Sequence, residues 1–124
     1  MTDAEVERLA QLALAYIKTH PDTPYDTGNL KINALQMRKV GAFNYEIFIE
    51  IDIAPYQTYL NERETVGGTS HRNRHWHWWE KMRVNVSEYL LKIISNGYND
   101  KTVSDELAMF EKMLRDQENG GNET

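Results

Sequence analysis

The residues best equipped for chemistry lie in one stretch, HRNRHWHWWEKM, at residues 71–82. It holds three of the four histidines and all three tryptophans of the chain. Imidazoles can bind a transition metal or move protons, whereas indole rings can stack on bases or fill a core. The element that carries these side chains decides among these uses, and the apolar spacing predicts a helix from His75 to about Ser95.

The histidines do not form a metal site on such a helix. At about 100° per residue, His75 and His77 point roughly 200° apart and cannot share one ion. His71 and His75 have the i, i+4 spacing of a ligand pair, but no third ligand lies near them in the sequence. We therefore expect no metal and no other cofactor.

Catalysis also lacks its usual sequence signals. No nucleophile elbow and no paired-acid motif accompany the histidines. The triplet formed by Asp26, Thr27 and Gly28 matches that of aspartic proteases, which need a second aspartate and an extended flanking strand. Here the triplet opens an expected short helix or turn at 26–35, in which Asp26 or Thr27 is the N-cap. We expect no enzymatic activity.

The tryptophans are better explained as core anchors. One stripe of the expected helix comprises His75, Trp79, Met82, Val86, Leu90 and Ile93. A helix with such a stripe turns it toward the core, and large aromatic side chains contribute much of the buried area of a small domain. We expect Trp79 to be buried beside Met82 and Val86, with Trp78 at the flank of the stripe.

A nucleic-acid interface is the alternative use of residues 71–83. Arg72, Arg74, Lys81 and Arg83 alternate with aromatic rings there, and such rings can stack on bases. Against this, the chain has a net charge of −5, whereas nucleic-acid binding needs a basic face that replaces phosphate counterions. The acidic balance disfavours a nucleic-acid partner, and a small binding module remains the second hypothesis.

The remaining composition narrows the class of protein. The 124 residues suit one domain, and the absence of cysteine excludes disulfides and thiolate chemistry. The N-terminus has acidic residues early and no unbroken apolar run, unlike a signal peptide. No stretch approaches the ~20 apolar residues of a membrane span, so we expect no membrane partner.

Two amphipathic helices are expected at the ends of the chain. Thr2 and Glu5 have the spacing of a capping box, and the helix that follows should stop by His20, because Pro21 disfavours helical geometry before it. A last helix at 102–117 has one apolar stripe formed by Val103, Leu107, Phe110 and Leu114. Residues 118–124 should be a disordered tail, which leaves a single domain at 1–117.

A hairpin is expected between these helices. The residues from Tyr45 to Ile53 alternate, with isoleucines on one face and Phe48 as an exception among the acids. The acidic face comprises Glu46, Glu50 and Asp52. One apolar and one polar face indicate an antiparallel sheet, with residues 36–41 as a weaker strand and a turn at 41–44. The predicted class is α+β: a small antiparallel sheet packed against the first helix and the helix that starts near His75.

Three landmarks of the sequence resemble a known family. TPYDTGNLKINAL (23–35), IDIAPYQTYLNE (51–62) and HWHWWEKM (75–82) follow one another in this order. They resemble the DTG segment, the Ala-Pro-Tyr-x-x-Tyr run and the aromatic pair opening a long helix in the tail-completion, or minor capsid, proteins of long-tailed bacteriophages. The resemblance covers residues 1 to about 95.

The resemblance implies a structural virion protein without catalytic residues. Such proteins act in head–tail joining at the neck, where copies form a homo-oligomeric ring that docks the tail tube onto the connector. The implied location is the virion, and the host cytoplasm during assembly, for a phage or a prophage.

The resemblance also gives individual residues expected roles. Asp26, Thr27 and Gly28 would cap the short helix, and Tyr56 and Tyr59 would pack their segment on the sheet. The loop at 63–74 would order on assembly. A ring uses two different patches of each subunit, so one charged patch must meet another on the neighbour. The expected patches are Glu46, Glu50 and Asp52 on one side and Arg72, Arg74 and Arg83 on the other.

Overall fold

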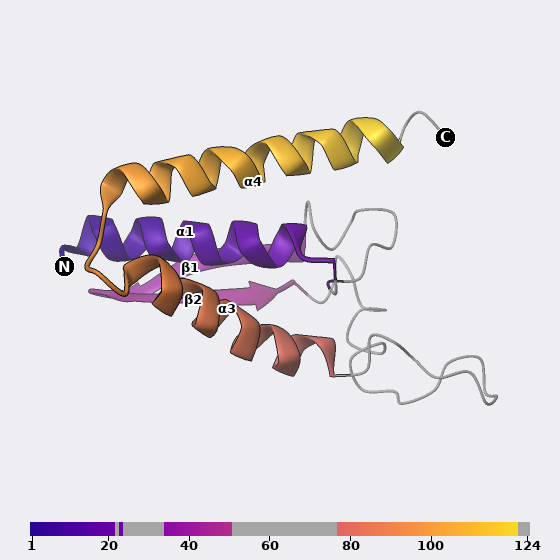
Figure 1. Ribbon diagram of the computed structural model, residues 1–124. Coiled ribbons are helices and arrows are strands. Elements are labelled where there is room, and N and C mark those ends of the chain that lie inside the picture. The colour runs from indigo at the N-terminus through magenta and orange to yellow at the C-terminus, as the bar shows by residue number, and fades with distance from the viewer. Residues whose placement is uncertain (22, 24–33, 51–76, 122–124) are drawn as a thin grey trace.

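The fold is of the α+β class, as the sequence predicts. The computed structural model describes residues 1–21, 23, 34–50 and 77–121, with side chains through 117. These residues form helix α1, strands β1 and β2, and helices α3 and α4, in chain order. Helix α1 lies in the middle, with α4 along one side and the strands and α3 along the other (Figure 1). The two strands pair in an antiparallel sheet.

Helix α1 spans Asp3–Thr19, and the local sequence sets both ends. The Thr2 hydroxyl oxygen accepts a hydrogen bond from the Glu5 backbone N–H at 3.1 Å, and the Glu5 carboxylate accepts one from the Thr2 N–H at 2.8 Å. The predicted capping box is therefore confirmed. The helix stops before His20, whose backbone is extended because Pro21 follows it.

Strands β1 (Leu35–Gly41) and β2 (Asn44–Ile49) form the predicted hairpin. Its turn places Phe43 at a left-handed φ of 58°. The predicted alternation is confirmed for Ile47 and Ile49, which both pack on the core, whereas Ile51 and Ile53 lie outside the described residues. The short helix or turn expected at 26–35 extends too far, because Leu35 already belongs to β1 and pairs with Ile49. Residues 24–33 lie outside the described part of the chain.

Helix α3 spans Trp78–Ile94, so the predicted start at His75 is wrong. His77 is the N-cap and has a left-handed backbone with φ 56° and ψ 28°. A right-handed helix cannot run through a residue in this conformation, and α3 therefore begins directly after it. The periodicity of the side chains carried no sign of this interruption.

Helix α4 spans Asp100–Gly121 and packs on α1. Its predicted stripe is confirmed: Val103 and Phe110 are buried, and Leu107 and Leu114 are partly buried. The helix includes residues 118–121, so the tail predicted from residue 118 begins too early. Once a helix is docked by its stripe, each further residue adds one backbone hydrogen bond, which offsets the weak propensity of this segment.

Two clusters of buried side chains use opposite faces of α1. The cluster that we call the hairpin core comprises Ile17, Ala34, Leu35, Trp78 and Met82. The cluster that we call the helical core comprises Leu9, Leu12, Ala15, Val103 and Phe110. Partly buried residues of α3 reach both clusters, with Val86 beside the first and Tyr89 beside the second. Helix α1 therefore holds the sheet, α3 and α4 in place.

Candidate interaction surfaces

The outward face of the hairpin carries an internal ion pair. Arg38 on β1 lies opposite Glu46 on β2, and its guanidinium contacts the Glu46 carboxylate at 3.0 Å. The same guanidinium lies over the Phe48 ring, 4.7 Å from its centroid. Glu46, expected to meet a basic patch on a neighbour, thus has a cation within its own hairpin. Sequence reasoning missed Arg38, because a turn at 42–43 alone would pair residues 39 and 46, and the register shift between Lys39 and Gly41 brings Arg38 opposite Glu46 instead.

The other members of the expected charged patches are described only in part. Glu50 follows β2, is half-buried, and donates its backbone N–H to the Ala34 carbonyl at 2.8 Å. Arg83 lies exposed on α3. Asp52, Arg72 and Arg74 lie outside the described residues, so the pairing of the two patches stays a prediction.

The residues expected to cap the short helix and to pack the following segment on the sheet also lie outside the described residues. This holds for Asp26, Thr27, Gly28, Tyr56 and Tyr59.

For the tryptophans the structure corrects the prediction. Trp78 is buried, with 1% of its surface exposed, whereas Trp79 is only half-buried. Both rings belong to the hairpin core region and meet edge to face, with centroids 5.4 Å apart. Met82 is fully buried, as predicted. The buried Trp78 ring has no free face on which a nucleic-acid base could stack.

His77 is the one histidine of the stretch within the described residues. Its Nδ1 lies 3.6 Å from a carboxylate oxygen of Glu80 at the start of α3. Within the described ranges, no three His, Asp or Glu side chains come together as metal ligands would. No helix in this part of the chain is long and apolar enough to span a bilayer.

An acidic side chain ties α1 to the hairpin tip. The Asp3 carboxylate accepts hydrogen bonds from the Lys39 ammonium, the Phe43 backbone N–H at 2.9 Å and the Tyr45 hydroxyl at 3.2 Å. The Lys39 hydrogen bond, followed by that from Phe43, holds the pKa of Asp3 below its ordinary value. The same contact raises the pKa of Lys39. This cluster fixes the hairpin against the first turn of α1.

A second polar contact closes the helical core. The Tyr89 hydroxyl donates to the Glu106 carboxylate at 2.6 Å, and the Tyr89 ring stacks on Tyr16 with centroids 4.5 Å apart. Burial, and then the hydrogen bond to Glu106, raise the pKa of Tyr89. Phe110 meets both tyrosines edge-on. This contact joins α1, α3 and α4.

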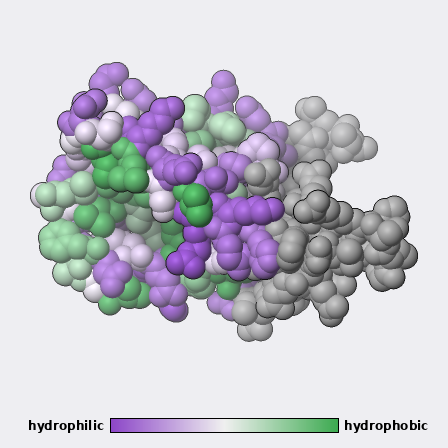
Figure 2. Space-filling view, turned by 60° about the horizontal axis from the view of Figure 1, so that its bottom comes forward, coloured by the Kyte–Doolittle hydropathy of each residue, from purple (hydrophilic) through white to green (hydrophobic). Residues whose placement is uncertain are grey.

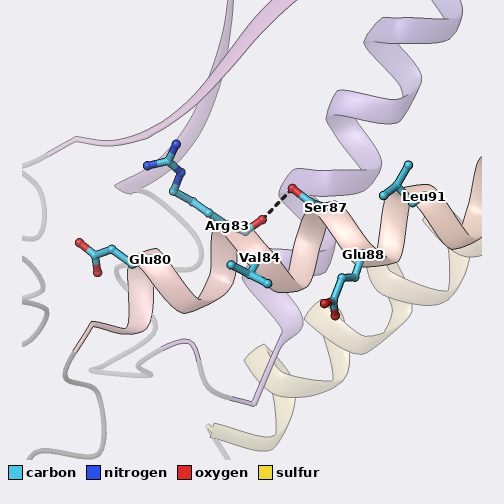
Figure 3. A pocket seen from close by; sticks show the side chains of 6 residues that line it. All are labelled: Glu80, Arg83, Val84, Ser87, Glu88 and Leu91. Atoms are coloured by element: carbon cyan, nitrogen blue, oxygen red, sulfur yellow. Dashed lines mark hydrogen bonds between the residues drawn. The ribbon is translucent and has the colours of Figure 1, made fainter.

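The outward face of α3 is apolar along its middle. Val84 and Leu91 are 58% and 65% exposed, and seven residues place them on the same side of the helix. Glu80, Ser87 and Glu88 line the same shallow pocket (Figure 3). Helix α3 is anchored behind this face, because the side chains on its opposite side pack in the two cores.

A separate groove runs between β2 and α3. Its wider part, of about 430 Å³, lies between Tyr45 on β2 and Leu90 on α3. Its narrower part, of about 280 Å³, lies between Ile47 and Trp79. Ile47 and Val86 line both parts, so the two are continuous. In the space-filling view, apolar side chains gather toward the end of the molecule away from the grey atoms (Figure 2), the end where the hairpin tip lies in Figure 1.

Comparisons with known proteins identify no relative of this chain. No protein-family model, no curated protein and no solved structure matches the chain.

Proposed function

We propose that the protein is a structural component of a phage virion, which forms a ring at the head–tail junction and joins the tail tube to the connector. The observation that carries this proposal is the outward face of α3. Large apolar side chains on a rigid, solvent-facing helix favour contact with another protein, because covering them removes apolar surface from water.

The composition of this face suits a subunit contact. Val84 and Leu91 form its centre, and Glu80, Arg83 and Glu88 are the charged groups beside them. An apolar centre with a charged rim is the usual anatomy of a specific protein interface. In a ring each subunit offers this face to a different patch of its neighbour, so the contact repeats until the ring closes.

The order of elements gives further support. The resemblance implies an N-terminal helix, then a hairpin, then a long helix opened by an aromatic pair. In this chain α1 precedes the hairpin, and Trp78 and Trp79 are the first residues of α3.

Charge substitutions on the outward face test the proposal. Val84→Arg combined with Leu91→Arg should leave the melting temperature nearly unchanged, because both side chains are exposed. The same variant should abolish ring formation with the connector and tail-tube proteins, measured by light scattering and by complementation of a phage that lacks the gene. Met109→Arg combined with Met113→Arg is the matched control, since these residues are exposed on α4.

Two results would contradict the proposal. One is normal complementation by the α3 double variant, and the other is absence of the protein from purified virions by mass spectrometry. The nucleic-acid hypothesis makes a separate prediction: binding to a labelled single strand at physiological salt that weakens steeply as salt rises.

A further inference from the structure

The groove between β2 and α3 has the features of a site for an extended peptide. Its floor is α1, where Ala10 and Ala13 contribute small side chains. It extends from Val6 to Ile17, a distance of about 16 Å at 1.5 Å per residue. That length accommodates about five residues of an extended strand.

One wall of the groove is the edge of β2 that no other described strand pairs with. Among the described residues the sheet has only two strands, so β2 has a partner on one side alone. The Glu50 N–H donates to the Ala34 carbonyl, and in an antiparallel ladder the residues that bond to the partner alternate with those that do not. By this alternation and the observed register, the N–H and C=O groups of Tyr45, Ile47 and Ile49 point to the open edge.

The other wall combines apolar side chains with a cation. Trp79, Val86 and Leu90 face the groove from α3. Arg83 lines the narrower part, and its guanidinium makes no ion pair with any described residue. Arg83 also lines the shallow pocket on the outward face of α3, and in Figure 3 its side chain extends away from Val84 and Glu88, so it lies at the border of the two surfaces. A guanidinium at the rim favours a carboxylate on the occupant.

We infer that this groove binds an extended segment of a separate polypeptide, which adds as a strand to the free edge of β2. Two apolar side chains of the segment, separated by one residue, fill the two parts of the groove on either side of Ile47. An acidic residue of the segment pairs with Arg83 at the Trp79 end. Main-chain hydrogen bonds to Ile47 supply affinity, and the two pockets supply specificity, as in other strand additions.

The occupant is a single strand rather than the edge of another folded sheet, because α3 walls the groove on the side opposite β2. Among the described residues the groove shares only Arg83 with the outward face of α3, so its partner is additional to the ring contact proposed above. The two proposals can fail independently, since one concerns assembly of the virion and the other binding to the isolated protein.

The test uses the full chain labelled with ¹⁵N and a blocked synthetic peptide, acetyl-Glu-Ile-Thr-Ile-Thr-amide. Titration should shift the amide resonances of Tyr45, Ile47 and Ile49. Ala10→Leu, which fills the floor of the groove while keeping a good helix former, should weaken binding at least tenfold. Ala4→Leu, the same change at an exposed site on α1, should not change binding.

Charge and backbone controls sharpen the test. Arg83→Glu should weaken binding about tenfold, as loss of one charge-assisted hydrogen bond implies, and should favour a peptide with lysine in place of glutamate. Lys81→Glu makes the same charge change at an exposed position two residues away on α3 and should have little effect. A peptide N-methylated at the residues that face β2 should not bind.

Four results would overturn the inference. They are the absence of any shift with millimolar peptide, equal binding of the N-methylated peptide, an Ile47 amide already protected from exchange in dilute monomer, and protection that rises with protein concentration together with dimer formation. The third would show that the chain covers its own edge, and the fourth that a second copy does so.

Discussion

The hairpin core and the helical core share α1 but differ in how they are closed. The helical core is covered by helices and by the stacked rings of Tyr16 and Tyr89, and Phe110 packs edge-on against both. The hairpin core ends at an open apolar groove beside Ile47. A two-stranded sheet keeps free edges, whereas the faces of a helix can be covered on several sides. The difference indicates that the helical core stabilises the fold and that the hairpin core combines stability with a site for a partner.

The polar contacts of the two cores differ in the same way. The Tyr89–Glu106 hydrogen bond joins α3 to α4 and is partly buried. The cluster around Asp3 joins α1 to the hairpin tip and is exposed to water. Solvent screening makes the exposed cluster the weaker of the two. Three substitutions, each with a comparison variant, measure how much these contacts contribute to stability.

The largest expected effect concerns Trp78, the anchor of the hairpin core. Trp78→Ala should lower the free energy of unfolding by about 3–5 kcal/mol, the usual range for truncating a buried aromatic residue. Trp79→Ala should cost less, because Trp79 is only half-buried. Denaturant unfolding of both variants measures the difference. A greater loss for Trp79→Ala would restore the assignment made from the helical wheel.

A smaller effect is expected in the helical core. Tyr89→Phe removes the hydrogen bond to Glu106 but keeps the ring stack, so it should cost about 1 kcal/mol. The raised pKa of Tyr89 means that the folded protein keeps this proton above pH 10 while the unfolded chain loses it. Wild-type stability should therefore fall as the pH rises above 10, and part of this fall should be absent in Tyr89→Phe.

Tyr98→Phe is the control, because the Tyr98 hydroxyl donates to Asp100 in an exposed contact at 3.0 Å. It should reduce stability less than Tyr89→Phe does. Equal losses in the two variants would show that burial adds nothing to the Tyr89 contact.

The smallest effect is expected at the hairpin tip. Asp3→Asn should lower stability at neutral pH, because the carboxylate accepts three hydrogen bonds there. The pKa of Asp3 lies below its ordinary value of 3.8, so the wild type has this contribution at neutral pH and loses it as the pH falls below that value. The difference between wild type and variant should accordingly shrink in acid.

Thermal melts from pH 7 to pH 2 measure the Asp3 effect. Glu7→Gln removes a carboxylate one turn along α1 that accepts none of the three hydrogen bonds of Asp3, and it is the matched control. A constant difference between wild type and Asp3→Asn across this range would mean that the cluster does not couple to the Asp3 charge.

Local sequence determined the elements whose signals are local. Thr2 and Glu5 set the start of α1, Pro21 sets its end, and the alternation of apolar and polar residues predicted the inward face of β2 with Ile47 and Ile49. The last helix was predicted by its stripe for the same reason. In each case neighbours within four residues, or the period of a single element, contain the necessary information.

Tertiary structure decided the contacts that side chains make between different elements. Trp78 and Trp79 both lie within one turn of Met82, so periodicity alone could not choose between them; the direction in which α3 meets α1 and β1 buried Trp78. The same holds for Glu46, whose partner Arg38 depends on the hairpin register. The groove is the clearest case, because its floor and its two walls come from three elements far apart in sequence, and no single stretch encodes the space between them.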